Sequence, residues 1–308
     1  MPKQTSKTAI KTIFVTGASG FIGAPLCETL AQQGYTVIKA TRDVKKGQQE
    51  GYVYWQPDAD TLDTDKLARL APDAVIHLAG PTIGRYWWPW YKTYLMTNRT
   101  KSATLLAKAC TDGVIKPQVF IGASAIGYYG NRTSEADEAA PKGQGFAANL
   151  VARMEEALAP VHNTQIRLVN ARFGIVLGQG GGALKQMLPP FKLGFGGPMG
   201  NGTQHMSWIA LQDTLAALIE VLEKPVYAGV VNITSPHTVT NALFSRMLAQ
   251  SINRPCLLPM PAFMVKLLFG QMGKELLLNG APVLPKELQK NGYTFKLPHL
   301  DQALKAVL

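Results

Sequence analysis

The sequence predicts an α/β protein with a doubly wound parallel sheet and a smaller, mostly helical C-terminal lobe. Two observations predict this class: β-branched segments alternate with helical segments through the first half, and a glycine-rich turn directly follows the first strand. Such alternation implies parallel strands joined by right-handed helical crossovers. The 308 residues are 46% hydrophobic and 17% charged, which supplies enough apolar side chains for a large buried core.

The strands expected in the first half are short and rich in β-branched residues, which is typical of strands buried on both faces. They cover residues 12–16, 35–40, 52–55, 74–78, 119–121 and 166–170. Apolar residues at helical spacing predict helices between them, at about 21–33, 90–110 and 146–159. We therefore expect a Rossmann-like, dinucleotide-binding domain over 10–175, completed by a late return strand near 229–234.

After about Gly174 the chain becomes rich in glycine loops. Helices are expected afterwards at about 240–252 and 262–278 and from 300 to the end, with prolines between them. We expect residues 176–308 to form a substrate or cap lobe that covers the carboxyl edge of the sheet.

The turn after the first strand has the glycine spacing of a phosphate-binding loop, and it reads Gly17-Ala18-Ser19-Gly20-Phe21-Ile22-Gly23. Gly17 permits a tight turn, Gly20 lets the backbone approach a diphosphate, and Gly23 allows the helix to pack closely on the strand. Free N–H groups at the start of the helix stabilise phosphate charge. The motif lies between a strand and a helix, which is the context that it requires.

The end of the second strand predicts which dinucleotide binds. NAD sites usually carry an acidic residue there, whereas this chain has Thr41 and Arg42, with Lys45 and Lys46 close behind. A guanidinium can hold a 2′-phosphate through two parallel hydrogen bonds, so NADP(H) is favoured over NAD. Ser19 in the turn is a further donor. Asp43 argues the other way, because a shift of one residue would place a carboxylate at this position.

Composition excludes several other classes. The net charge is +11, but the basic residues are dispersed rather than gathered in the stripe typical of nucleic-acid binders, so no nucleic-acid partner is expected. The sequence has no apolar run long enough for a membrane span and no apolar signal core near its start. The three cysteines are scattered and predict neither a metal site nor a disulfide framework. We expect a cytoplasmic protein with no membrane partner.

The motifs together resemble the extended short-chain dehydrogenase/reductases. The resemblance is carried by Thr16-Gly17-xx-Gly20-xx-Gly23, His77-Leu78-Ala79-Gly80 and Ser124-Ala125-Ile126-Gly127-Tyr128-Tyr129-Gly130. The second half is similar to an atypical branch generally labelled "epimerase family" and sometimes called YfcH-like or SulA-like. That similarity rests on Phe173-Gly174-Ile175-Val176-Leu177-Gly178, residues 194–202, Ser207-Trp208-Ile209 and Asn232-Ile233-Thr234-Ser235-Pro236.

The resemblance implies further cofactor contacts. Leu78, Ala79 and Gly80 would lie along the cofactor. Arg99, on the helix after the fourth strand, matches the arginine of a Ser-Arg pair of the branch, with Asn98 in place of the serine. Arg99 is therefore either a cofactor ligand or an ordinary surface arginine.

The catalytic pair of the wider family is missing. The family uses a serine or threonine together with Tyr-x-x-x-Lys on a helix, where residues i and i+4 share a face. Ser124 fits the serine position, but Phe146 and Leu150 stand at the tyrosine and lysine positions. Phenylalanine exchanges no proton, and leucine cannot shift a pKa.

Other groups are candidates for acid–base chemistry. Tyr128 and Tyr129 follow Ser124 closely, and His205 lies in a glycine-rich loop. Each could equally be a packed residue. The pair Tyr35 and Lys39 matches the family spacing, but it lies on a predicted strand, where four residues span roughly 13 Å, so we reject it.

Two hypotheses about function remain open. The first is an NADP(H)-dependent oxidoreductase or epimerase that acts on an unknown small molecule with non-standard proton donors. The second is a cofactor-binding regulator or sensor without turnover, which Phe146 and Leu150 favour. The tryptophans at 87, 88 and 90 fit a substrate cleft, a partner contact or core packing. Neither the substrate nor the oligomeric state can be predicted, because fold does not determine them.

Overall fold

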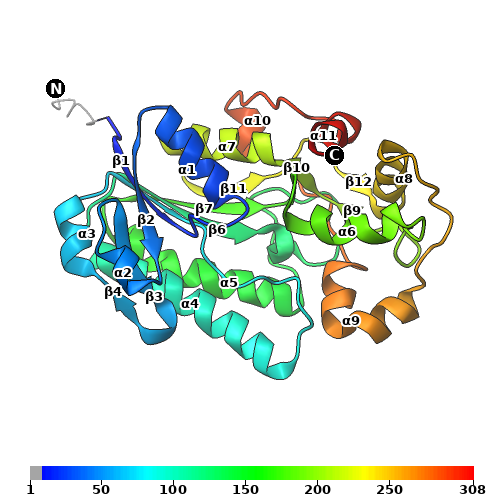
Figure 1. Cartoon of the computed structure of the whole chain (residues 1–308), viewed down its shortest axis with the longest axis horizontal. Helices are drawn as coiled ribbons and strands as arrows, with labels where there is room; N and C mark the ends of the chain where they lie inside the picture. The colour runs from blue at the N-terminus through cyan, green and yellow to red at the C-terminus, as the bar shows by residue number, and fades with distance from the viewer. Residues whose placement is uncertain (1–8) are drawn as a thin grey trace.

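The computed structural model describes residues 9–308, and an eight-stranded sheet runs through its centre (Figure 1). The strand order is β11-β7-β6-β5-β1-β2-β3-β4. The strands are β1 (Thr12–Thr16), β2 (Thr36–Thr41), β3 (Tyr52–Gln56), β4 (Thr61–Leu62), β5 (Ala74–His77), β6 (Val119–Ala125), β7 (Arg167–Phe173) and β11 (Gly229–Ile233). All neighbours are parallel except β3 and β4. The predicted doubly wound sheet is confirmed, including its late return strand.

Helices cover both faces of the sheet. One face carries α1 (Gly23–Gln32), α7 (Leu211–Glu223) and α10 (Lys286–Lys290), and the other carries α3 (Thr64–Leu70), α4 (Pro89–Thr111) and α5 (Phe146–Leu158) (Figure 1). The short α2 (Val44–Gly47) follows β2. Alternation along β1 explains the two layers: Ile13 and Val15 enter the core beneath α1 and α7, while Phe14 enters the core beneath α4.

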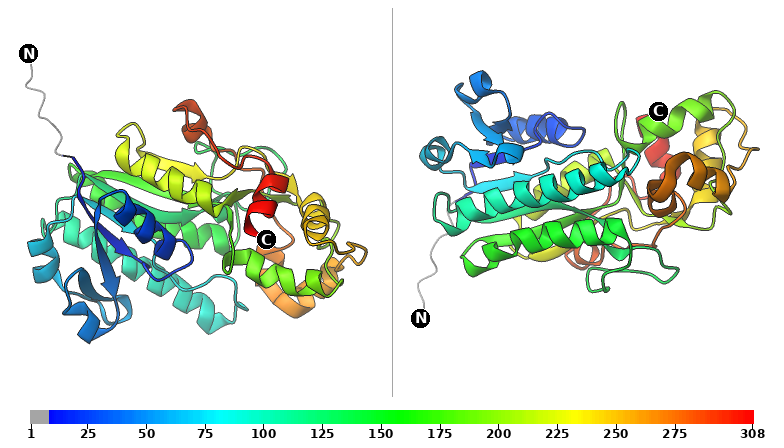
Figure 2. Two further views of the ribbon diagram at one scale, coloured as in Figure 1. Left: turned by 45° about the horizontal axis from the view of Figure 1, so that its top comes forward. Right: turned by 90° about the horizontal axis from the view of Figure 1, so that it is seen from below.

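The second lobe lies beyond the carboxyl ends of the strands (Figure 2). It contains α6 (Gly182–Lys192), α8 (Asn241–Ser251), α9 (Ala262–Leu276) and α11 (Leu300–Val307). Two small sheets connect it, one pairing β8 (Ile175–Leu177) with β10 (Trp208–Ala210) and the other pairing β9 (His205–Met206) with β12 (Val239–Thr240). A core of its own, with Trp208 and Phe244 fully buried, holds α6, α8 and α11 together.

Three helices of the second half were not predicted: α6, α7 and the short α10. Gly180 to Gly182 and the Pro189-Pro190 pair hide α6 in the sequence, because glycine and proline normally mark loops. The helix α7 was missed although its buried residues recur at helical spacing. Its residues Ala217 and Val221 pack in the core of the large sheet, so we group α7 and β11 with the dinucleotide-binding unit.

The helix predicted at 262–278 is interrupted. Gly270 has a φ of +57° inside α9, so the two halves of α9 meet at a kink that a side chain would strain. Within residues 9–308, no helix has the length and hydropathy needed to cross a membrane. The expectation of no export signal rests mainly on residues 1–8, which lie outside the described part of the chain.

Candidate functional site

A cavity of about 670 Å³ opens at the carboxyl ends of β1 and β5. The strand order reverses between these two strands, and α/β sheets of this kind bind ligands at that point. The cavity is lined by residues 17–20, 39–43, 55–58 and 78–81, together with Lys46, Tyr52, Tyr94 and Asn98. Its lining extends from the end of β2, past the glycine-rich turn, to the segment after β5.

The glycines of the first turn have the spatial roles that their spacing predicted. Gly17 has a φ of +72°, and a Cβ there would lie 2.8 Å from the backbone nitrogen of Ala79. A Cβ on Gly23 would lie 2.1 Å from the carbonyl oxygen of Gly17. Side chains at either position would separate the turn from its neighbours. The turn is therefore held close to both the segment after β5 and the start of α1.

Free backbone donors gather at the start of α1. Within residues 9–308, the N–H groups of Ser19, Phe21 and Ile22 have no protein acceptor, and no side chain caps the helix. Such donors suit the oxygens of a diphosphate. The ring of Phe21 does not line the cavity but packs on the loop of the second lobe, 2.2 Å from where a Cβ on Gly181 would stand. Phe21, Ile22 and Gly23 can thus contact a cofactor through the backbone only.

A cationic cluster occupies the end of the cavity nearest β2. Lys39, Arg42 and Lys46 all line it, and the guanidinium of Arg42 has no partner within the described residues. The carboxylate of Asp43 instead caps α2 by accepting a hydrogen bond from the N–H of Lys46 at 3.0 Å. The acidic residue that argued for NAD therefore uses one carboxylate oxygen, Oδ1, for this cap, although Asp43 also lines the cavity. This end fits the extra phosphate of NADP(H).

The sequence reading missed a polar pair in the same cavity. Asn98 donates to the carboxylate of Asp58 at 2.6 Å, and both residues line the cavity. Trp55 Nε1 and Gln56 Oε1 are buried there without a protein partner. Unpaired buried polar atoms are costly and indicate a ligand or ordered water. Nothing in the sequence marked Asp58, because it follows β3 closely and lies in no known motif.

Arg99 is half-buried and has no acidic partner within residues 9–308. Its Nη2 donates to the carbonyl oxygen of Pro81 at 2.8 Å, its Nη1 lies 3.7 Å from the sulfur of Met154, and its Nε has no acceptor. A Cβ on Gly80 would lie 3.3 Å from the guanidinium carbon. Burial lowers the pKa of Arg99. The guanidinium of Arg99 is therefore partly shielded from solvent and lacks an anion within the described residues, which favours its interpretation as a cofactor ligand.

His77 ends β5 beside this guanidinium. Its Nδ1 lies 2.7 Å from the hydroxyl of Thr16, and its Nε2 lies 3.4 Å from the hydroxyl of Ser102. Burial, with a smaller contribution from Arg99, lowers the pKa of His77 to about 4. The ring is therefore neutral at physiological pH and braces the ends of β1 and β5.

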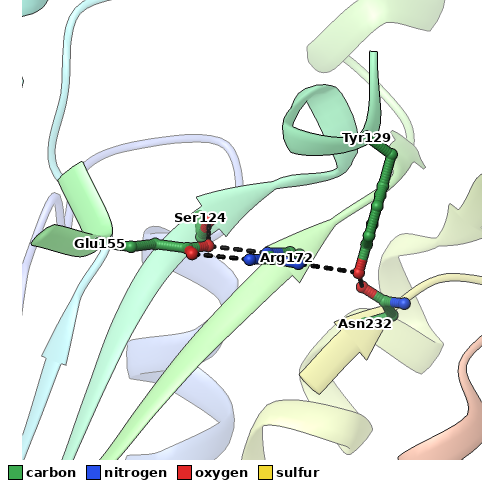
Figure 3. A network of polar contacts seen from close by, with 5 residues as sticks. All are labelled: Ser124, Tyr129, Glu155, Arg172 and Asn232. Carbon is green, nitrogen blue, oxygen red and sulfur yellow. Dashed lines mark hydrogen bonds and ion pairs between the residues drawn. The ribbon is translucent and has the colours of Figure 1, made fainter. Parts of the chain in front are cut away.

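The serine predicted to be catalytic belongs to a buried charge network (Figure 3). Ser124 donates to Glu155 at 2.5 Å, and Arg172 holds both carboxylate oxygens at 2.8 and 2.7 Å. Arg172 also donates to the hydroxyl of Tyr129 at 3.0 Å, which donates to Asn232 at 2.7 Å. The network thereby joins five elements: β6, η2 (Ile126–Tyr129), α5, β7 and β11. The network fixes the carboxyl ends of three neighbouring strands.

The three predicted catalytic residues differ in what their hydroxyls can still do. Tyr129 is fully buried and both its donor and an acceptor site are used, so the structure gives it no route to a substrate. The hydroxyl of Ser124 donates a hydrogen bond to Glu155 but retains lone pairs that can accept another. Tyr128 is half-buried, its ring lies 3.5 Å from the guanidinium of Arg172, and its hydroxyl has no partner in the described chain.

Phe146 and Leu150 lie one turn apart at the start of α5, as their spacing predicted. Leu150 is buried among apolar side chains of α4 and α9, and the ring of Phe146 packs against Trp87 at 4.9 Å. Glu275 of α9 accepts hydrogen bonds from the N–H groups of Phe146 and Ala147 at 3.1 and 2.9 Å. At the positions of the family's tyrosine and lysine, this chain therefore has apolar side chains, and the contacts there hold α9 of the second lobe against α5.

None of the catalytic candidates lines the cavity: Ser124, Tyr128, Tyr129 and His205 all lie outside its lining, as does Arg99. His205 is in β9, and its Nδ1 is buried without a partner. Trp87 is buried and donates to the carbonyl oxygen of Ile83 at 3.0 Å, so core packing explains it. Trp88 and Trp90 remain 55% and 66% exposed.

Two family models match this chain, one over most of its length and one near its C-terminal end. Residues 13–234 match the NAD dependent epimerase/dehydratase family. The chain belongs to this family. Residues 260–307 match a domain of unknown function, DUF1731, which covers α9 to α11. The resemblance to the epimerase family branch is thereby confirmed.

Similar proteins occur in bacteria and animals and extend over the whole chain. Epimerase family protein ML0860 of Mycobacterium leprae is 35% identical over 98% of this chain and 96% of its own length. Human epimerase family protein SDR39U1 is 35% identical over 96% of this chain and 99% of its own length.

Solved structures support the same assignment. A crystal structure of human SDR39U1 with NADPH superposes with a TM-score of 0.85 at 33% identity, covering 96% of this chain and 98% of the human one. UDP-glucuronic acid 4-epimerase from Bacillus cereus, in complex with UDP-glucuronic acid and NAD, gives a TM-score of 0.76 at 20% identity over 96% of this chain and 97% of its own. The second likeness concerns the fold alone.

Proposed function

We propose that this epimerase-family protein binds NADP(H) in the cavity between β1 and β5 and transfers hydride to or from a small substrate. One observation carries the cofactor assignment: the cavity holds free N–H groups at the start of α1 together with Arg42, whose guanidinium forms no ion pair within residues 9–308. The human relative crystallised with NADPH supports it. When bound, the nicotinamide would supply or accept the hydride.

The proposed proton donor is Tyr128. Its hydroxyl is uncommitted, while the Arg172 guanidinium against its ring keeps the ring in place. Ser124 would orient the substrate. The Ser124 hydroxyl already donates a hydrogen bond to Glu155. It can therefore accept a hydrogen bond from a substrate hydroxyl, but it cannot donate one to a substrate carbonyl without rearrangement. The geometry therefore favours a hydroxyl-bearing substrate as the form that binds.

A screen for hydride transfer tests this function. Oxidation of alcohols and sugar nucleotides with NADP, and reduction of small ketones and quinones with NADPH, would be followed at 340 nm and by NMR for epimerised product. Tyr128→Phe should lower kcat by about 100-fold or more, whereas Tyr54→Phe, on β3 and four strands away from β6, should leave it unchanged. Full activity of Tyr128→Phe would remove this residue from the reaction.

A non-catalytic regulator is the second candidate, favoured by the packing of Phe146 and Leu150 at the positions of the family's tyrosine and lysine. It predicts NADPH binding without turnover of any substrate, and a partner protein retained only when NADPH is present. Measurable turnover that Tyr128→Phe abolishes would exclude this reading as a complete account.

The cellular location of the protein and its lack of a nucleic-acid partner are also proposals. We propose a cytoplasmic protein that does not bind nucleic acid, because several of its basic side chains, among them Lys39, Arg42 and Lys46, line the dinucleotide cavity. Salt-dependent binding of random duplex DNA at micromolar concentration would contradict the second part of this proposal.

A further inference from the structure

The end of the second lobe farthest from the dinucleotide cavity carries an unusual concentration of exposed apolar side chains. We define the lobe tip as three segments: residues 192–195 after α6, residues 254–258 before α9, and the first half of α9, residues 262–269. Its exposed large apolar residues are Leu193 (72%), Phe195 (67%), Leu257 (77%), Leu258 (54%), Phe263 (69%), Met264 (39%), Leu267 (77%) and Leu268 (53%). In the first half of α9 only Val265 is fully buried.

The segments of the lobe tip are neighbours in space. The N–H of Met260 donates to the carbonyl oxygen of Pro198, and the N–H of Gly200 donates to the carbonyl oxygen of Met260. A Cβ on Gly194 would lie 3.9 Å from Pro255. The connection between α8 and α9 therefore lies against the connection that follows α6, and Figure 2 shows both at one end of the molecule.

The charged residues of the lobe tip itself all have one sign, because they are Lys192, Arg254 and Lys266. No aspartate or glutamate stands between Glu156 and Asp213 or between Glu223 and Glu275, so α6, α8 and nearly all of α9 lack acidic residues. Basic residues are interspersed there, namely Lys185, Lys192, Arg246, Arg254, Lys266 and Lys274. None of them forms an ion pair within residues 9–308. An apolar surface that also carries cations without ion pairs suits a partner that is both apolar and anionic.

We propose that the lobe tip docks on the surface of an anionic lipid membrane, with its apolar residues at the boundary of the headgroups and its cations near lipid phosphates. Apolar side chains inserted to a shallow depth and basic residues near the surface contribute together to such binding. A second copy of this chain fits less well, because two tips that meet would bring like charges together. The proposal replaces the sequence-based expectation of no membrane partner. It does not require a membrane-spanning helix and is independent of the reaction in the cavity.

Co-sedimentation with vesicles tests the proposal on the full chain. Vesicles of phosphatidylcholine with 30% phosphatidylglycerol should retain the protein, and pure phosphatidylcholine vesicles should retain much less. Leu267→Ser and Lys266→Glu should each weaken binding by about fivefold or more. Val226→Ser and Arg69→Glu are matched controls, since both residues are exposed but lie away from the tip, and they should bind as the unmodified protein does.

The outcomes separate the alternatives. Thermal unfolding and NADPH binding of each variant show whether the fold is intact, so that loss of vesicle binding cannot be attributed to unfolding. Failure of the unmodified protein to bind anionic vesicles would overturn the proposal, as would equal losses in tip and control variants. A dimer in analytical ultracentrifugation that Leu267→Ser dissociates, without vesicle binding, would assign the tip to self-association instead.

Discussion

Replacing Glu155 by alanine removes the only carboxylate that neutralises a buried guanidinium. The side chain of Arg172 is 3% exposed and makes two hydrogen bonds to Glu155. Burial lowers the pKa of Arg172, but the bonds to Glu155 and Tyr129 outweigh burial and place it above its ordinary value. Without Glu155 the burial cost of the cation remains and its compensation is lost.

The expected loss of unfolding free energy is about 3–5 kcal/mol, the usual cost of breaking a buried ion pair on one side. For a chain of 308 residues this corresponds to a decrease in Tm of roughly 5–8 °C. The next residue provides a control, because Glu156 pairs with Arg153 at the surface, where the two side chains are 62% and 68% exposed. Glu156→Ala should change stability by no more than about 0.5 kcal/mol.

Urea unfolding followed by circular dichroism measures both variants. A double variant, Glu155→Leu with Arg172→Met, should be more stable than Glu155→Ala alone, because it removes the unpaired charge together with its partner. If Glu155→Ala costs less than about 1 kcal/mol, or if the double variant is the less stable one, the reasoning from buried charge is wrong.

Three further predictions concern the cavity. Arg42→Ala should raise the Kd for NADPH by about 10- to 100-fold and leave that for NADH within twofold, as judged by calorimetry, whereas Lys45→Ala, outside the lining, should change neither. Gly17→Ala should weaken NADPH binding at least tenfold and lower Tm, because its Cβ would meet the backbone of Ala79 at a φ of +72°; an unchanged Kd would contradict the close approach. Since the pKa of His77 is lowered to about 4, the folded protein binds no proton there as pH falls from 6.5 to 4 while the unfolded chain does, so stability decreases across that window. Between pH 7 and pH 5 this loss should be about 2 kcal/mol in urea unfolding and absent in His77→Gln; equal pH slopes would refute it.

The sheet and the phosphate turn could be predicted because both depend on local signals. Buried parallel strands have continuous β-branched runs, and Gly17 and Gly23 occupy positions where a Cβ would meet backbone atoms. The helices α6 and α7 were missed for different reasons: Pro189 and Pro190 suggest a loop, while α7 lies in a region otherwise dominated by glycine.

The catalytic end of the site could be predicted only in part. Ser124 is followed by two tyrosines, and the sequence cannot show that the hydroxyl of Tyr129 is committed to Arg172 and Asn232 while that of Tyr128 is not. The partners come from β7 and β11, far along the chain. Asp58 was missed for the same reason, since only the fold brings it to Asn98.

The central claim is that the cavity between β1 and β5 selects a dinucleotide with an additional phosphate. Isothermal titration of the unmodified protein with NADPH and with NADH tests it most directly. We predict saturable binding of NADPH at one site per chain, at least tenfold tighter than binding of NADH. Equal affinities for the two, or no heat from NADPH, would contradict the account.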